Sequence, residues 1–231
     1  MYLANACGNT FLVLFDQGPS TWERLAQLRA QNRWRFDTAL VLRESTHASV
    51  EMHVVEKDGT VSAMCGNGLR AVAAVLDDVG LPRHVRVSTG ILTIERSLRG
   101  HYRVPMRAVV RQERLHLVEG EPHVVKLVRD VFAAPLIHWG KEHVPFANTT
   151  VVSSDTLRTI HARTFERGVN QETASCGTGA CAAASAVREA RGLSRLQVDI
   201  LMHGHTLTVS TSDTETILEG SVHIQPLRRI A

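Results

Sequence analysis

Two cysteines lie in glycine-rich segments that match each other along the sequence. Residues 64–76 read MCGNGLRAVAAVL and residues 175–187 read SCGTGACAAASAV, and the two segments align without a gap. In each, two glycines and then an Ala-rich run follow the cysteine, which predicts that a helix begins there. Cys65 and Cys176 are therefore expected at two helix N-termini. Such a terminus binds a carboxylate and favours the thiolate form of a neighbouring cysteine.

Two such thiols around one bound anion form a pair of acid and base groups. A carbon acid between them can lose a proton from one face and regain one on the other, which inverts its configuration. The alternative for a single C-G-x-G segment is a small buried cysteine at a tight helix start. The duplication favours the catalytic interpretation, and we expect the two helix N-termini to face one cleft, with Cys65 opposite Cys176.

The segments that flank the two cysteines repeat as well. Asp37 and Asn148 each lie 28 residues before their cysteine. Residues 85–94 (VRVSTGILTI) and 198–209 (VDILMHGHTLTV) each read as two alternating strands with a glycine between them. The sequence therefore predicts an α+β fold made of two copies of one unit.

Composition and charge limit the classes of function that fit the chain. Its 231 residues, 44% of them hydrophobic, are enough for one large domain or two small ones, each with a core. The formal charge is +3 and no block of like charges occurs, so neither nucleic acid nor a membrane is an expected partner. No apolar run approaches the roughly 20 residues that span a bilayer. The cysteines show no C-x-x-C spacing, so no metal site is expected. The first apolar run has no charged region ahead of it, so we expect a cytoplasmic protein. The low, scattered charge favours a small molecule as its substrate.

Several short motifs resemble those of one enzyme family. They are GNTF at 8–11, KDGTVSAMCGNGLRA at 57–71, VSTG at 87–90, FERG at 165–168 and ETASCGTGAC at 172–181. The sequence resembles diaminopimelate epimerase and its relatives, the PLP-independent amino-acid racemases, through nearly its whole length. A proline-racemase-like protein also carries two such cysteines, but its first motif usually reads C-G-H-G, whereas this one reads C-G-N-G.

The resemblance implies two pseudo-symmetric domains of similar topology, each a β-sheet wrapped around a central helix, with the active site in the cleft between them. We expect residues 1–108 to form the N-terminal half and residues 109–221 the C-terminal half, with a C-terminal strand at 222–231 as a candidate addition to the first half. The family uses no cofactor, so none is expected here.

The resemblance also implies roles for individual residues. Cys65 and Cys176 correspond to the two catalytic bases of the family. The residues expected to bind substrate are Asn9, Asn148, Glu166 and Arg167, together with the backbone amides of Gly66, Asn67, Gly177 and Thr178 around the α-carboxylate.

Three positions depart from the family pattern at the far end of the expected substrate pocket. Thr38 replaces the Gln of F-D-Q, Glu56 the Asn of F-N-A-D-G, and Lys141, within GKEH, the Asn of G-N-P-H. We expect these three residues to influence which side chain the pocket accepts. A helical segment that precedes the Asn148 position in the family is expected to be missing, and Arg70 is interpreted as a solvated helix charge.

The function that this pattern predicts is cofactor-independent inversion of an amino acid at Cα by two cysteines. Diaminopimelate is the leading substrate, converted from the LL to the meso form in lysine biosynthesis. One alternative is a racemase of another polar amino acid, such as histidine, and another is a non-catalytic paralogue that binds an amino acid. The expected partners are a small amino-acid substrate and a second copy of the chain in a homodimer.

Overall fold

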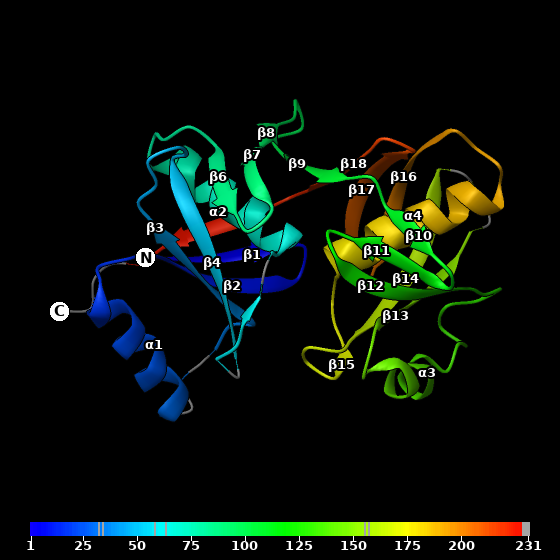
Figure 1. Ribbon diagram of the computed structural model, residues 1–231, viewed down its shortest axis with the longest axis horizontal. Coiled ribbons are helices and arrows are strands. Elements are labelled where there is room, and N and C mark those ends of the chain that lie inside the picture. Colours follow the sequence, from blue (N-terminus) through cyan, green and yellow to red (C-terminus); the bar gives the residue numbers. More distant parts are fainter. Residues whose placement is uncertain are drawn as a thin grey trace. The chain divides into compact units, whose positions relative to one another are not determined.

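The chain divides into two compact units, shown in Figure 1. One comprises Met1–Val104 and Ser221–Ala231, and the other comprises Pro105–Gly220. The structure is a computed structural model that describes residues 1–31, 33, 35–57, 59–62, 64–154, 156 and 158–227. Residues 228–231 of the predicted C-terminal segment therefore lie outside the described residues.

The first unit contains a mixed sheet of eight strands. Their order is β19-β1-β2-β3-β4-β6-β7, and β5 pairs with β4 at the side of this path. The strands are β1 (Tyr2–Ala6), β2 (Asn9–Phe15), β3 (Thr38–Arg43), β4 (Val50–Glu56), β5 (Val61–Ser62), β6 (His84–Val87), β7 (Gly90–Thr93) and β19 (His223–Pro226). The chain therefore returns at its C-terminal end to add β19 beside β1.

The second unit contains a larger mixed sheet, in the order β10-β11-β12-β13-β14-β16-β17-β18-β9, with β15 paired to β14. The strand β9 (Tyr102–Arg107) spans the boundary between the two units and pairs at its start with β8 (Glu95–Arg96). The other strands are β10 (Val110–Gln112), β11 (Leu115–Val118), β12 (Glu121–Leu127), β13 (Asn148–Ser153), β14 (Thr159–Glu166), β15 (Gln171–Glu172), β16 (Arg195–Met202), β17 (His205–Ser212) and β18 (Glu215–Gly220).

The two sheets repeat one pairing pattern. In the first unit, β1–β2, β3–β4 and β6–β7 are antiparallel, whereas β2–β3 and β4–β6 are parallel. In the second unit, β11–β12, β13–β14 and β16–β17 are antiparallel, whereas β12–β13 and β14–β16 are parallel. The predicted duplication of one α+β unit is therefore confirmed, including both hairpins that follow the cysteine motifs.

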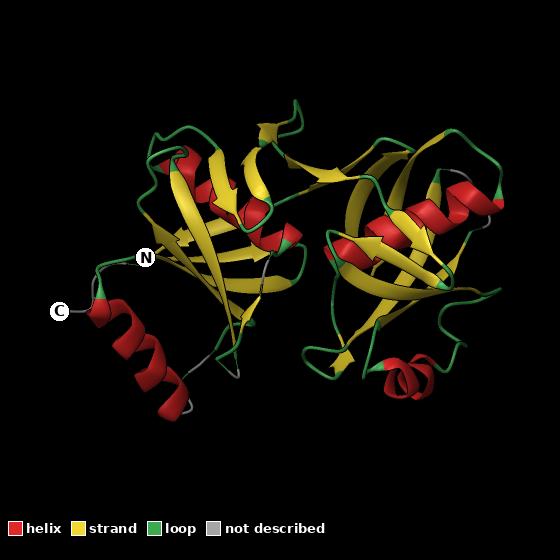
Figure 2. Cartoon of the chain, viewed as in Figure 1, coloured by secondary structure: helices red, strands yellow, loops and turns green. Residues whose placement is uncertain are grey.

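A buried helix crosses each sheet, as Figure 2 shows. These central helices are α2 (Gly66–Asp78) and α4 (Gly177–Ala190). Nearly every residue of both is buried, and α4 contacts seven strands of its sheet, from β11 to β18. A helix that is apolar on all sides must be enclosed. Within the described part of the chain, no helix is long and apolar enough to cross a membrane.

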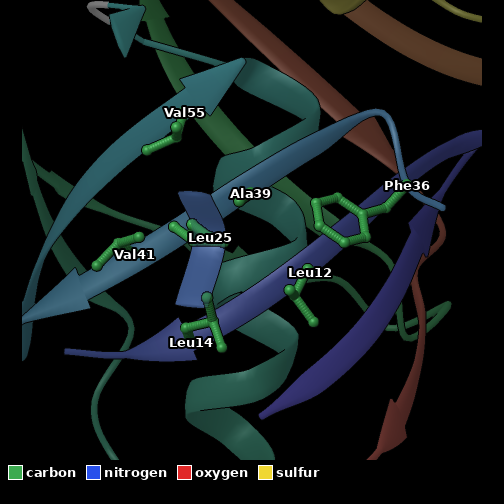
Figure 3. Packing of buried hydrophobic residues seen from close by; sticks show 7 residues of the cluster. All are labelled: Leu12, Leu14, Leu25, Phe36, Ala39, Val41 and Val55. Atoms are coloured by element: carbon green, nitrogen blue, oxygen red, sulfur yellow. The ribbon is translucent and has the colours of Figure 1, made fainter. Parts of the chain in front are cut away.

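A second helix covers the outer face of each sheet. In the first unit α1 (Pro19–Ala30) places Leu25 against Leu12, Leu14 and Val41, in the apolar cluster that Figure 3 shows. In the second unit α3 (Leu136–His143) packs on β13 and β14, the strands that carry Val151 and Phe165. A short helix of eight residues, α3, therefore precedes Asn148 in this chain.

Candidate active site

Each cysteine of the repeated motif is the N-cap residue of a central helix. Cys65 caps α2 and Cys176 caps α4, both with extended backbone. The Sγ atom of Cys65 accepts the backbone N–H of Gly68 at 3.3 Å, and the Sγ atom of Cys176 accepts that of Gly179 at the same distance. The predicted thiol at the start of each helix is therefore present. In this position each sulfur accepts one of the first N–H groups of the helix, which lack partners within it.

In the first unit, Asn9 and Asn67 lie together beside Cys65. Asn9 is the first residue of β2, and Asn67 follows Cys65 by two positions in α2. The side-chain nitrogen of Asn67 donates a hydrogen bond to Oδ1 of Asn9. The structure thus brings together two residues that the sequence assigned to substrate binding, one from a strand and one from the helix terminus.

Arg70 is not a solvated helix charge, and this interpretation was wrong. Its side chain is fully buried and is among the largest buried side chains of the chain. It reaches back along α2 and donates to Oδ1 of Asn67 through Nη2. The physical reason is that the sheet and the crossing strands enclose α2 on all sides, so a long side chain in its middle has no path to solvent.

Thr38 and Glu56 form a second cluster at the same end of this sheet. They are direct neighbours on β3 and β4, and Thr38 is also in register with Phe11 near the start of β2. The carboxylate of Glu56 accepts hydrogen bonds from the Thr38 hydroxyl at 3.2 Å and from the Ser62 hydroxyl at 2.7 Å. Two of the three expected specificity residues are therefore in contact.

In the second unit, Asn148 lies beside a histidine that the sequence analysis missed. Asn148 begins β13 and is in register with His123 on β12. The backbone N–H of Arg167 donates to Oδ1 of Asn148 at 2.9 Å. This turns the side-chain nitrogen of Asn148 toward Nε2 of His123, which is 3.4 Å away. Because that nitrogen is a donor, Nε2 must act as an acceptor.

His123 links Asn148 to the second cysteine through Thr178. Burial, with smaller contributions from the charges of His116 and Arg167, lowers the pKa of His123 to about 3. The ring is therefore neutral at ordinary pH, with its proton on Nδ1, 3.1 Å from the Thr150 hydroxyl.

The Thr178 hydroxyl lies 3.0 Å from Nε2 of His123 and 3.4 Å from Sγ of Cys176. Donation to the ring leaves the Thr178 oxygen as an acceptor for the Cys176 thiol. The N–H of Gly179 is in turn a donor for the thiolate. The surroundings of Cys176 therefore suit both protonation states of an acid and base group.

Glu166 and Arg167 lie next to this network at the end of β14. The Thr173 hydroxyl donates to Oε1 of Glu166. The guanidinium of Arg167 is 3.2 Å from the carboxylate of Glu121, and both side chains are well exposed. Arg167, which the sequence analysis expected to bind substrate, thus has an acidic partner within its own unit.

Among the described residues, no hydrogen bond or ion pair joins Lys141 to the network around His123, Asn148 and Cys176. Lys141 is exposed on α3, the helix that packs on the outer face of β13 and β14. The tetrapeptide 120–123 reads G-E-P-H and keeps three of the four letters of G-N-P-H, whereas GKEH keeps two. It contains both His123 and Glu121. This sequence signal was sufficient to find the two residues and was overlooked.

Comparisons with known proteins agree with this architecture. No family model matches the sequence. The chain is 33% identical to the diaminopimelate epimerase of Halorhodospira halophila over 79% of this chain and 77% of that protein. It is 29% identical to the diaminopimelate epimerase of Cupriavidus necator over 96% of both chains.

Solved structures share the fold at much lower sequence identity. A PhzF-family phenazine biosynthesis protein from Enterococcus faecalis matches with a TM-score of 0.69 and 13% identity, over 97% of this chain and 96% of that chain. A hydroxyproline epimerase from Agrobacterium vitis matches with a TM-score of 0.69 and 14% identity, over 98% of this chain and 90% of that chain.

The duplicated fold and the relatives together define a class of enzyme, the amino-acid epimerases and racemases, and the protein is an isomerase of this class. Within this class, the chain belongs to the diaminopimelate epimerase family. The sequence-based assignment to that family is therefore confirmed.

Proposed function

We propose that the protein inverts an amino acid at Cα by two proton transfers, with Cys65 and Cys176 as the two acid and base groups. The observation that carries this proposal is the duplicated cap: each cysteine sits at a helix N-terminus, where its sulfur accepts an N–H at 3.3 Å. A single capping cysteine has a structural explanation, but the same arrangement in both repeats suits a reaction that needs one thiol on each face of a carbon.

The proposed reaction is balanced without an added reagent. A thiolate removes the Cα proton of the bound amino acid and becomes a thiol, and the electron pair remains on the substrate. The second thiol then delivers its proton to the opposite face of Cα and becomes a thiolate. The backbone N–H groups of Gly66, Asn67, Gly177 and Thr178 are the proposed cradle for the α-carboxylate, because helix N-termini bind anions. Asn9 and Asn148 are proposed to hold the rest of the amino acid.

Diaminopimelate is the first candidate substrate, converted from the LL to the meso form. The support is that the relatives of the chain include diaminopimelate epimerases. In addition, Asn148, Glu166 and Arg167 match the substrate-binding residues of the family motifs in sequence. A guanidinium such as that of Arg167 suits a distal carboxylate, which it can bind through two parallel N–H groups.

A second candidate is a racemase of an amino acid without a distal carboxylate, such as histidine. The specific observation is the ion pair between Arg167 and Glu121. Glu121 stands where the family motif G-N-P-H has Asn, so it adds a negative charge beside the guanidinium. Glu56 adds another carboxylate where the family has Asn. These carboxylates favour a substrate whose side chain is neutral or positively charged.

The purified enzyme should be incubated with a panel of L- and D-amino acids and diaminopimelate, followed by chiral chromatography. Conversion of any one of them supports the isomerase function and identifies the substrate. Binding of an amino acid without conversion would contradict the proposal and indicate a non-catalytic paralogue.

Replacing Glu121 with Asn is expected to shift the ratio of kcat/KM for diaminopimelate over histidine upward by about 10-fold, the effect of roughly 1.4 kcal/mol of differential binding. The reason is that Arg167 loses its acidic partner and becomes available to a distal carboxylate. Glu142→Gln, which removes an exposed negative charge from α3, is the matched control and should leave the ratio unchanged. If Glu121→Asn and the wild type have the same ratio, Glu121 does not influence which substrate the enzyme prefers.

A further inference from the structure

Arg70 is a fully buried arginine, and none of its contacts with the described residues involves an acidic group. Its Nη1 atom lies 3.4 Å from Sγ of Cys7 and 3.3 Å from the carbonyl oxygen of Ser221, and its Nη2 atom donates to Oδ1 of Asn67. None of these acceptors is a carboxylate. Among the residues that the structure describes, no hydrogen-bond partner for Nε is present.

If Arg70 served only to stabilise the fold, this arrangement would be unfavourable. A guanidinium carries a positive charge, and a buried charge without an ionic partner is unfavourable. An apolar side chain of similar volume is often neutral or favourable at a buried ionic position. Arg70 also reaches back to the first turn of α2, where the helix dipole is already positive. Both positive charges therefore favour an anion at that end of the helix.

The contacts of Arg70 determine the direction of a chain of hydrogen bonds. Because a guanidinium only donates, the side-chain oxygen of Asn67 must face it. The side-chain nitrogen of Asn67 then faces Asn9 and donates to its Oδ1. With Oδ1 of Asn9 engaged in this way, the side-chain nitrogen of Asn9 is directed away from Asn67 and acts as a donor.

The second repeat orients its asparagine by other means. At the positions that align with Asn67 and Arg70 it has Thr178 and Cys181, and Cys181 is buried against Met106. There the backbone N–H of Arg167 donates to Oδ1 of Asn148 and leaves the nitrogen as the donor. In both repeats, therefore, a group that can only donate binds the side-chain oxygen of an asparagine and fixes the orientation of its amide.

We propose that Arg70 is a positioning residue that fixes the amide orientation of Asn67 and, through it, of Asn9, so that Asn9 offers N–H donors to an oxygen of the bound amino acid. This proposal rests on the proposed function for the identity of the ligand. The orientation of the two amides can be measured without any substrate, so the two proposals can fail separately.

The first test compares Arg70→Met with the wild type by NMR of the side-chain amides of Asn9 and Asn67 in ¹⁵N-labelled protein. Asn9→Asp and Asn67→Asp variants assign the two signals. We expect both signals to shift in Arg70→Met and their hydrogen exchange to become faster, because Asn67 loses its fixed acceptor role. Unchanged signals in Arg70→Met would overturn the proposal, whether or not the enzyme is active.

The second test measures KM and kcat with the substrate that the panel of amino acids identifies. In Arg70→Met, KM is expected to rise about 10- to 100-fold, the range for one lost charge-assisted hydrogen bond, while the thermal midpoint is kept or raised. The control is Arg188→Met, which removes another buried arginine, paired with Asp213 and the Ser194 carbonyl in the second unit. This control should lower the thermal midpoint and leave KM unchanged.

Two more variants keep the proposal falsifiable if Arg70→Met does not fold. Arg70→Lys keeps one donor for Asn67 and should give a KM between those of the wild type and Asn9→Asp. Asn9→Asp still accepts from Asn67, so its stability should be kept, but it lacks the N–H donors and KM should rise. A wild-type KM in Asn9→Asp, or a KM in Arg70→Lys as high as that of Asn9→Asp, would contradict the proposed role of the chain of amides.

Discussion

Replacing either Cys65 or Cys176 with alanine is expected to slow epimerisation by at least about 10²- to 10⁴-fold, because a positioned acid or base contributes that much. Each thiol is used in every turnover, one as base and the other as acid. Steady-state rates in both directions with the substrate identified by the panel measure the effect. The double variant should be little slower than either single variant, since groups that act as one unit are not additive.

Cys181→Ala is the matched control for these variants. Cys181 lies in α4 and is fully buried, with its thiol 3.7 Å from the sulfur of Met106. Its loss should reduce stability slightly and leave the epimerisation rate within a few-fold of the wild type. If Cys176→Ala were as active as Cys181→Ala, the two thiols would not be the acid and base groups of the reaction.

Gly68 and Gly179, which are equivalent in the two repeats, are expected to differ in how well they tolerate replacement by alanine. A Cβ atom added at Gly179 would overlap the Thr164 hydroxyl and lie 3.2 Å from that of Thr150. The Thr150 hydroxyl lies 3.1 Å from Nδ1 of His123, and the two hydroxyls are 3.1 Å from each other. Gly179→Ala is therefore expected to lower the free energy of unfolding by about 1–3 kcal/mol, as overpacking does, and to reduce activity about 10-fold or more by displacing the support of His123.

Gly68→Ala is the control for this substitution. A Cβ atom at Gly68 would lie 3.1 Å from a methyl group of Leu40, a side chain that can shift. Alanine is also a better helix former than glycine by about 1 kcal/mol, which offsets the crowding. Chemical denaturation of the two variants should therefore show a large loss for Gly179→Ala and nearly none for Gly68→Ala. Equal losses would contradict the explanation by the threonine hydroxyls.

The repeated fold could be predicted from sequence because its signals are local. The cysteine, the two glycines and the following Ala-rich run predict a capped helix, and the alternating segments around Gly90 and Gly204 predict hairpins. Both features recur at nearly the same spacing, which is sufficient to recognise two copies.

The contacts of the candidate site were harder to predict because they depend on enclosure and register. Arg70 was misread because a charged residue on a helix is usually solvated. The surrounding residues of α2 are apolar on all sides, however, and a helix of that kind is enclosed. The link from His123 to Cys176 depends on the register of β12 with β13, which no local pattern fixes. Glu121 could have been found from the G-x-P-H spacing alone.

The incorporation of solvent deuterium at Cα of product and of remaining substrate tests the two-base proposal most directly. In deuterated water, the thiol that protonates Cα carries deuterium, whereas the thiolate on the other face removes protium from the substrate. The first turnovers, started from either enantiomer or epimer, should therefore give product labelled at Cα while the remaining substrate stays largely unlabelled. Label that appears equally early in substrate and product would contradict the account, because one group would then both remove and return the proton.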